Sequence, residues 1–239
     1  MDISQSWIVN KKIAHRGLHN GKFPENSLGA FGSAAKHGFA IELDARLLSD
    51  GKVAVFHDES LSRMTGSDGY ICNFDSQKLK ALRLLKTDER IPLLSDVLEQ
   101  TDGKAPVLIE LKNQDKVGAL EQAVIKLLED YKGEFAVQSF NPYSLEYFKQ
   151  NAPQIVRGQL SSFFKNDRLS RFKRFALKRL LFNKIAQPSF IAYNFADLPN
   201  RWVTKAALPV LAWTIRSQAD YAAAKDFCDN IIFENFIPE

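Results

Sequence analysis

The stretch that decides the fold is AIELDARLLSDGKVAVFHD, residues 40–58. It contains two apolar, β-type runs, and only eight residues separate Asp44 in the first from Val53 in the second. A parallel crossover needs about a dozen residues or more, whereas Asp50-Gly51 is a strong signal for a two-residue hairpin turn. We therefore predict that the two runs form a local antiparallel hairpin.

The rest of the chain alternates between strand and helix patterns, which is typical of βα units and a parallel sheet. We predict strands at residues 13–15, 40–45, 53–57, 107–111, 135–139, 155–159, 190–194, 210–214 and 231–234. Centring the hairpin on its turn pairs Ser49 with Lys52 and Asp44 with His57, so one of these runs is an extra antiparallel strand. About eight parallel strands remain, which favours an irregular (β/α)8 TIM barrel over an open doubly wound sheet.

The chain is expected to form one domain with one small insertion. The segment from Asp58 to Pro106 is too long for a single crossover, so we expect an insertion after the third strand, roughly residues 59–105. Barrels of this length commonly fold as one domain, here residues 1–239. Asn26 is expected to cap a helix that follows it.

Composition excludes several classes of protein. A formal net charge of +4 is too small to indicate a nucleic-acid-binding protein. Cys72 and Cys228 have neither CxxC spacing nor a nearby histidine pair, which argues against a disulfide framework or a zinc site. The N-terminus lacks the apolar segment of a signal peptide, and the chain has no run of 18 apolar residues. We therefore expect a cytoplasmic protein.

Three carboxylates are placed to meet at the mouth of the predicted barrel. Active sites of such barrels lie at the C-terminal ends of the strands. Glu42 and Asp44 are two residues apart on one strand and so point to the same face, and Glu110 ends a later strand. An all-carboxylate site suits Mg²⁺ or Ca²⁺. The alternative is that the acids form strand-end ion pairs with basic neighbours, namely Arg16, Arg46 and Lys112.

Two of the four histidines also end strands. His15 and His57 at one rim are suited to acid/base chemistry, because one can remove a proton from an attacking hydroxyl while the other protonates a leaving oxygen. Arg16 offers a bidentate fork to a phosphate, and Lys112 offers a point charge. The alternative for each histidine is a packed or solvated side chain without a chemical role.

Together these motifs resemble the glycerophosphodiester phosphodiesterase family. The matching segments are HRG at 15–17, PEN at 24–26, ELDARLLSDGKVAVFHD at 42–58 with LSRMTG after it, IPLLSDVL at 91–98, IELK at 109–112, QSF at 138–140 and AWT at 212–214. Their order and approximate spacing match over nearly the whole chain. The resemblance implies an irregular (β/α)8 barrel and divalent-metal-dependent hydrolysis of glycerophosphodiesters to glycerol 3-phosphate and an alcohol.

The resemblance also implies a role for each site residue. The catalytic histidines are then His15 and His57; the metal ligands are Glu42, Asp44 and Glu110; Arg16 and Lys112 hold the phosphate; and Trp213 packs near the glycerol. Two other functions stay open. A barrel without activity would serve as a binding or membrane-docking module, and a lysophospholipase D would use the same scaffold on lysolipids.

Residues 163–185, FFKNDRLSRFKRFALKRLLFNKI, carry eight basic residues and a single acid, Asp167. At helical spacing, one face holds Leu169, Phe172, Ala176 and Leu180, and the other holds Arg168, Arg171, Arg174 and Lys178. One interpretation is an outer barrel helix with its apolar stripe on the core. The other is a peripheral contact with anionic membrane, in which nearby aromatic side chains insert, namely Phe163, Phe164, Phe175 and Phe182.

Overall fold

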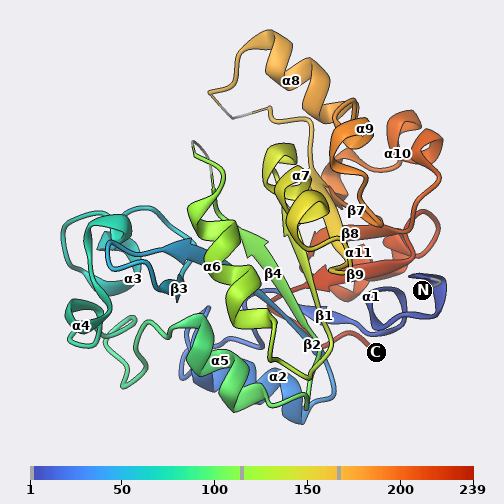
Figure 1. Cartoon of the computed structure of the whole chain (residues 1–239). Helices are drawn as coiled ribbons and strands as arrows, with labels where there is room; N and C mark the ends of the chain where they lie inside the picture. Colours follow the sequence, from blue (N-terminus) through green and yellow to red (C-terminus); the bar gives the residue numbers. More distant parts are fainter. Residues whose placement is uncertain (1–2, 114–115, 166–167) are drawn as a thin grey trace. The chain divides into compact units, whose positions relative to one another are not determined.

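The computed structural model describes residues 3–113, 116–165 and 168–239 (Figure 1). The chain divides into two compact units, one of Ala14–Phe135 and one of Met1–Ile13 with Ala136–Glu239. That all 239 residues form one domain therefore stays a prediction. No helix in the described ranges is long and apolar enough to cross a membrane.

The first unit carries the strands that end in ionisable residues. Its elements are β1 (Ile13–Ala14, at the junction), α2 (Leu28–Lys36), β2 (Ala40–Leu47), β3 (Val53–Val55), α3 (Ser62–Thr65), η2 (Ile71–Asn73), α4 (Ser76–Leu79), α5 (Leu94–Thr101), β4 (Val107–Leu111) and α6 (Ala119–Leu128). β2 pairs with β4 in parallel, with Asp44 opposite Glu110. β2 also pairs with β3 in the antiparallel sense, so the predicted hairpin is confirmed.

The predicted register of the hairpin is wrong by one residue. The N–H of Leu48, rather than that of Ser49, donates to the carbonyl of Lys52, at 2.8 Å. Gly51 has a φ of +78°, in the left-handed region that favours glycine. The connection is therefore a three-residue loop with a left-handed glycine, which is the next most common hairpin loop after the two-residue turns.

The shift in register changes the residue that faces Asp44. The N–H of Phe56 donates to the carbonyl of Asp44 at 2.8 Å, so Phe56 takes the place predicted for His57. The carbonyl of His57 instead accepts two hydrogen bonds from Arg46, at 2.9 Å from Nε and 2.7 Å from Nη2. His57 thus lies just beyond β3, with its backbone held by a side chain of β2.

The segment between β3 and β4 contains the predicted insertion. It holds α3, η2 and α4, followed by α5, which packs against α2. A small apolar core joins the insertion to the hairpin of β2 and β3. It is made of Leu48, Ala54 and Phe56 from the hairpin region and Leu61, Met64, Ile71, Leu79, Leu84 and Ile91 from the insertion. This core fixes α3 next to the end of β3.

The second unit continues the βα alternation. Its elements are η1 (Ile3–Gln5), α1 (Trp7–Asn10), β5 (Phe135–Ser139, at the junction), α7 (Pro142–Asn151), β6 (Arg157–Ser161), α8 (Arg171–Lys178), α9 (Asn183–Ala186), β7 (Phe190–Asn194), η3 (Phe195–Asp197), α10 (Arg201–Ala206), β8 (Val210–Ile215), α11 (Gln218–Ala224) and β9 (Asn230–Phe233). Strands β5 to β9 are parallel and adjacent in order. Asn230 ties the N-terminal segment to β9, because its Nδ2 donates to the carbonyls of Ile8 and Lys11 at 2.7 and 2.8 Å.

The strand order identifies the fold class. The strands are hydrogen-bonded in the order β1-β9-β8-β7-β6-β5-β4-β2-β3, and β1 also pairs with β2. This is the order of a closed eight-stranded parallel barrel with β3 as an extra antiparallel strand. The predicted irregular (β/α)8 TIM barrel is confirmed.

Candidate active site

Three buried carboxylates converge where the middle of β2 lies beside the C-terminal end of β4. Glu42, Asp44 and Glu110 each present an oxygen atom within 4.8 Å of the other two. All three side chains are buried. The parallel register explains the convergence, because Asp44 lies opposite Glu110 and Glu42 is two residues before Asp44 on the same face. The structure therefore brings together the three predicted ligands.

Two cations contact this carboxylate cluster. Lys112 Nζ lies 2.8 Å from Glu110 Oε1 and 3.2 Å from Asp44 Oδ1. Arg16 Nε lies 3.3 Å from Asp44 Oδ2, and the backbone N–H of Arg16 donates to Glu42 Oε2 at 2.9 Å. The ion pairs that were the alternative to a metal site are thus present for Arg16 and Lys112, whereas the guanidinium of Arg46 donates to the carbonyl of His57.

The charges of the cluster are unequally balanced. Burial, together with repulsion by Asp44 and Glu110, raises the pKa of Glu42 well above its ordinary value. Burial also raises the pKa of Glu110, although Lys112 opposes the change. For Asp44, burial acts upward, but Lys112 and Arg16 outweigh it and hold the pKa well below its usual range. The two cations therefore favour the ionised form of Asp44 more than that of the two glutamates.

The donor set fits a hard divalent cation. Three carboxylates offer only oxygen ligands, which Mg²⁺ and Ca²⁺ prefer. The raised pKa values of Glu42 and Glu110 show that the folded chain leaves negative charge at these two groups incompletely compensated. A cation bound between the three acids would supply that compensation.

The loop after β1 is shaped to bring Arg16 onto the cluster. Arg16 and Gly17 both have positive φ, +55° and +80°, and left-handed backbone at a residue such as Arg16 is typical of functional sites. Gly17 is required for a second reason: a Cβ there would lie 2.8 Å from the backbone carbon of Ala30 in α2. The turn thus fits closely under α2 and directs the Arg16 amide at Glu42.

Asn26 has a different role from the predicted helix cap. Ser27 caps α2, because its side chain accepts the N–H of Ala30. The Nδ2 of Asn26 instead donates to Asp44 Oδ2 at 2.8 Å, and its own N–H donates to the carbonyl of Arg16 at 3.0 Å. Asn26 therefore links the Arg16 loop to the carboxylate cluster.

His57 is oriented by its neighbour in the sequence. Its Nδ1 lies 2.7 Å from Asp58 Oδ1. Burial acts to raise the pKa of Asp58, but hydrogen bonds from Arg63 and His57 lower it to about 2. Burial lowers the pKa of His57 itself, so its imidazole is neutral near pH 7. An ionised Asp58 only accepts hydrogen bonds, so Nδ1 carries the proton and Nε2 is the nitrogen left for proton transfer.

The other two predicted site residues are placed less directly. His15 is half-buried and follows β1 directly, next to the Arg16 amide that binds Glu42. Trp213 belongs to β8 in the other unit, where its ring packs edge-on against Phe140 with centroids 5.5 Å apart. Within the described residues, the buried indole Nε1 of Trp213 has no hydrogen-bond partner. That Trp213 packs near a bound glycerol stays a prediction.

Sequence reasoning missed four residues that order this site. Glu25, Asn26, Asp58 and Arg63 all contact predicted site residues or one another. Each lies in a quoted motif, namely PEN, the HD at 57–58 and LSRMTG. The signal was therefore present, but nothing in the spacing showed which residues these side chains would meet.

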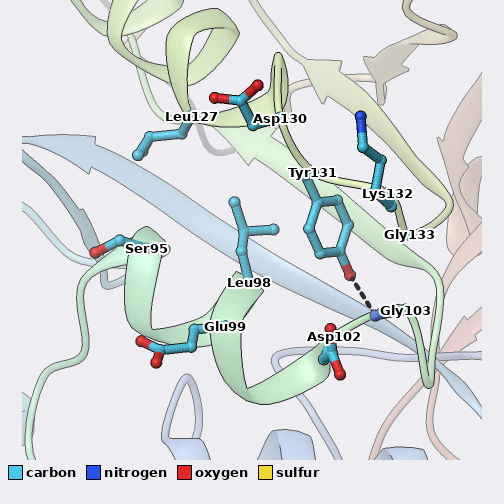
Figure 2. A pocket seen from close by; sticks show the side chains of 10 residues that line it. All are labelled: Ser95, Leu98, Glu99, Asp102, Gly103, Leu127, Asp130, Tyr131, Lys132 and Gly133. Carbon is cyan, nitrogen blue, oxygen red and sulfur yellow. Dashed lines mark hydrogen bonds between the residues drawn. The ribbon is translucent and has the colours of Figure 1, made fainter.

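A separate pocket of about 440 Å³ lies away from this chemistry (Figure 2). It is lined by residues from α5, from α6 and from the segments that precede β4 and β5, so it lies near the N-terminal ends of these strands. In Figure 2, the Tyr131 hydroxyl accepts the N–H of Gly103, at 3.3 Å. The pocket contains none of the predicted site residues. In β/α barrels, the face at the N-terminal ends of the strands usually contributes stability rather than catalysis.

Comparison with known proteins points in one direction. Residues 15–236 match the model of the glycerophosphoryl diester phosphodiesterase family. A glycerophosphodiester phosphodiesterase of Caldanaerobacter subterraneus subsp. tengcongensis is 36% identical over 159 residues, which are 62% of this chain and 65% of that protein. A lysophospholipase D of Rattus norvegicus is 35% identical over 140 residues, but these are 53% of this chain and only 43% of that protein.

A solved structure agrees with the fold. The phosphodiesterase of Oleispira antarctica, in complex with its product sn-glycerol-3-phosphate, has a TM-score of 0.80 to this chain at 24% identity. The match covers 95% of this chain and 93% of that one. At this level of identity the likeness concerns the fold, and it extends over nearly the whole length of both proteins.

Proposed function

This chain belongs to the glycerophosphoryl diester phosphodiesterase family, and on that premise we propose that it hydrolyses glycerophosphodiesters to glycerol 3-phosphate and an alcohol. The observation that carries the proposal is the buried carboxylate cluster of Glu42, Asp44 and Glu110, flanked by Arg16 and Lys112. A phosphodiester is an anion, and this arrangement offers it cationic side chains beside oxygen ligands suited to a divalent ion. A barrel used only for binding has no need of such a set.

We assign the residues as follows. Glu42, Asp44 and Glu110 hold one divalent cation, Mg²⁺ or Ca²⁺, which when bound neutralises phosphate charge and lowers the pKa of a hydroxyl group. Arg16 binds phosphate oxygens through its guanidinium, and Lys112 adds a point charge. Trp213 packs near the glycerol. The 239 residues act as one phosphodiesterase domain in the cytoplasm.

The reaction needs two proton transfers, which we assign to His15 and His57. One histidine takes the proton of the attacking hydroxyl as its oxygen bonds to phosphorus. The other donates a proton to the alcohol oxygen as the phosphorus–oxygen bond breaks. His57 is suited to either step through Nε2, because Asp58 holds Nδ1. Positioned acids and bases of this kind contribute about 10²–10⁴-fold each.

Release of glycerol 3-phosphate from a panel of substrates tests the function. We expect cleavage of small diesters such as glycerophosphocholine and glycerophosphoethanolamine, measured with a coupled glycerol 3-phosphate dehydrogenase assay. Lysophosphatidylcholine tests the second candidate, a lysophospholipase D, which the likeness to the rat enzyme favours. That activity would release choline and leave a phosphomonoester with its acyl chain. If neither small diester is cleaved, the proposed function is wrong, and cleavage of lysophosphatidylcholine alone would identify a lysophospholipase D instead.

We also propose that residues 163–185 make a peripheral contact with anionic membrane. α8 covers Arg171–Lys178, and on it Phe172 is 76% exposed and Phe175 is 42% exposed. The interpretation as an outer helix with its whole apolar stripe on the core is therefore wrong for Phe172, although Ala176 and Leu180 are buried. In Figure 1, α8 extends to the outer end of its unit, whereas its last residue, Lys178, contacts β7, because its carbonyl accepts a hydrogen bond from the Tyr193 hydroxyl at 2.9 Å.

The residues that would insert differ from those predicted. Phe164 is buried, and Phe163 packs against Tyr193 in an apolar cluster, so neither is available. The exposed apolar side chains are those of Phe172, Phe175 and Leu181, and exposed cations accompany them, namely Arg168, Arg171, Lys173 and Lys184. Asp167, the one acid of the segment, lies outside the described residues. Exposed phenylalanines beside cations are typical of helices that lie in a membrane interface.

Sedimentation with vesicles measures this contact. At low salt, the protein should pellet with vesicles that contain phosphatidylglycerol, should be released at high salt, and should not pellet with neutral phosphatidylcholine vesicles. Arg171→Gln with Lys173→Gln should weaken binding about 10–30-fold, since each cation contributes about 1 kcal/mol. Phe172→Ser with Phe175→Ser should weaken it as well.

The matched control removes two exposed lysines from other helices, Lys36→Gln with Lys126→Gln. This control should bind the anionic vesicles like the unchanged protein. Two results would show that α8 is not a membrane contact. One is that the unchanged protein stays in the supernatant with anionic vesicles at low salt; the other is that the control variant loses as much binding as the α8 charge variant.

A further inference from the structure

One guanidinium joins two carboxylates of the site. Arg63, on α3, donates from Nη1 to Glu25 Oε2 at 2.9 Å and from Nη2 to Glu25 Oε1 at 2.7 Å. It also donates from Nε to Asp58 Oδ2 at 2.5 Å and from Nη2 to Asp58 Oδ1 at 3.1 Å. Both carboxylates are therefore held in the two-point geometry that fixes direction as well as distance.

Each of the two carboxylates that Arg63 binds also contacts a predicted residue of the site. Asp58 Oδ1 lies 2.7 Å from His57 Nδ1, and Glu25 Oε1 accepts a hydrogen bond from Arg16 Nη1 at 2.8 Å. Arg63 is thus one residue removed both from the histidine assigned to proton transfer and from the arginine assigned to the phosphate.

We propose that Arg63 is a positioning residue that orients His57 through Asp58 and Arg16 through Glu25. The inference rests on the proposed function, because it names how two residues of that site are aligned. Without Arg63, Asp58 is free to rotate away from Nδ1, and the imidazole loses the partner that selects its Nδ1–H tautomer. Glu25 also loses one of the two guanidinium groups that bind it. The Arg16 side chain, which Glu25 holds, can then rotate away from the phosphate position.

Packing and a backbone hydrogen bond hold α3, which carries Arg63, in place. The neighbours of Arg63, Leu61 and Met64, are buried in the apolar core that joins the insertion to the hairpin. The N–H of Leu85 donates to the carbonyl of Met64 at 2.7 Å, which fixes the end of α3. The insertion therefore contributes a fixed anchor for the guanidinium.

Exposure separates positioning from stability. The Arg63 side chain is 48% exposed, so we expect its loss to lower the free energy of unfolding less than the loss of a buried ion pair would. Loss of a group that orients a site residue, in contrast, typically costs about 10–100-fold in activity. A purely structural role predicts the opposite pattern, with a lower melting temperature and unchanged kinetics.

The test compares Arg63→Gln with a matched arginine in the same insertion. Arg83 is 53% exposed and paired with Asp88, outside the site. We expect Arg63→Gln to lower kcat/KM for the best glycerophosphodiester about 10–100-fold, with a melting temperature close to that of the unchanged protein. Arg83→Gln should retain activity within about twofold. Arg63→Lys, which keeps one cation, should recover part of the loss.

Single variants separate the two contacts of Arg63, the one through Asp58 to His57 and the one through Glu25 to Arg16. Asp58→Asn should lower kcat with little change in KM, because Asp58 orients the residue assigned to proton transfer. Glu25→Gln should mainly raise KM, because Glu25 orients the residue assigned to phosphate binding. Adding Arg63→Gln to either variant should cost less than it costs alone, because residues that act through one another are not additive. Activity of Arg63→Gln within twofold of the unchanged protein, or fully additive losses, would overturn the proposal.

A spectroscopic readout keeps the proposal separate from the proposed function. ¹⁵N NMR of the histidine rings should show His57 with a protonated Nδ1 in the unchanged protein and in Arg83→Gln, and a mixture of tautomers in Arg63→Gln. If the unchanged protein cleaves no substrate, the function is wrong, and the NMR comparison still decides whether Arg63 orients His57. If His57 keeps its tautomer in Arg63→Gln, the positioning role is wrong whatever the activity.

Discussion

Hydrolysis should fall to the background of the assay when the protein is dialysed against EDTA, and Mg²⁺ or Ca²⁺ should restore it. The reason is the buried cluster of Glu42, Asp44 and Glu110, whose three oxygen donors lie within 4.8 Å of one another. Replacing one ligand should have an equally large effect: Glu42→Gln removes a charged donor but keeps the shape of the side chain. We expect this variant to lose both cation affinity and rate.

Cation binding can be measured without substrate. Mg²⁺ or Ca²⁺ should raise the melting temperature of the unchanged protein, because a ligand that binds the folded state stabilises it, and should not raise that of Glu42→Gln. The effect should grow as pH rises, since burial raises the pKa values of Glu42 and Glu110 and the cation must displace their protons.

An exposed glutamate on the surface provides the control. Glu129→Gln, at the end of α6, should leave activity and the cation-dependent melting shift unchanged. Full activity of the unchanged protein in EDTA would refute the metal assignment, and the acids would then be strand-end ion pairs with Arg16 and Lys112.

The strands and the carboxylates could be predicted because their signals are local. Glu42 and Asp44 share a face through the two-residue period of a strand, and the parallel pairing of β2 with β4 brings Glu110 beside them. Most predicted strands lie within one or two residues of the observed ones. The error in the hairpin register arose because Asp50-Gly51 suits two loop lengths, and tertiary packing rather than the dipeptide selects between them.

Contacts between distant residues account for what could not be predicted. Asn26 is a good helix cap by local rules, but its side chain bonds Asp44, 18 residues away, and Ser27 caps α2 instead. Arg63 meets Glu25 across 38 residues, so its role is visible only in the folded chain. The exposure of Phe172 has the same origin, since helical spacing gives the face of a side chain but not whether another element covers it.

Replacing His57 by alanine should lower kcat about 10²–10⁴-fold while changing substrate binding little. His57 lies just after β3, its carbonyl is held by Arg46, and its Nδ1 is held by Asp58, so alanine removes a proton-transfer group whose orientation the chain has fixed. His15→Ala should have a loss in the same range, since the reaction needs two proton transfers.

The pH profile shows which step His57 performs. Burial lowers the pKa of His57 below 6.5, and a base must be neutral, so as the base it would give kcat/KM an acid limb below pH 6.5. As the acid it must be protonated, and the rate would instead fall as pH rises through the lowered value. His37→Ala is the control, because His37 is exposed near the C-terminus of α2 with its Nδ1 2.8 Å from the carbonyl of Ser33. His37→Ala should retain activity within about twofold. If His57→Ala keeps kcat within about threefold, His57 is a packed residue without a role in proton transfer.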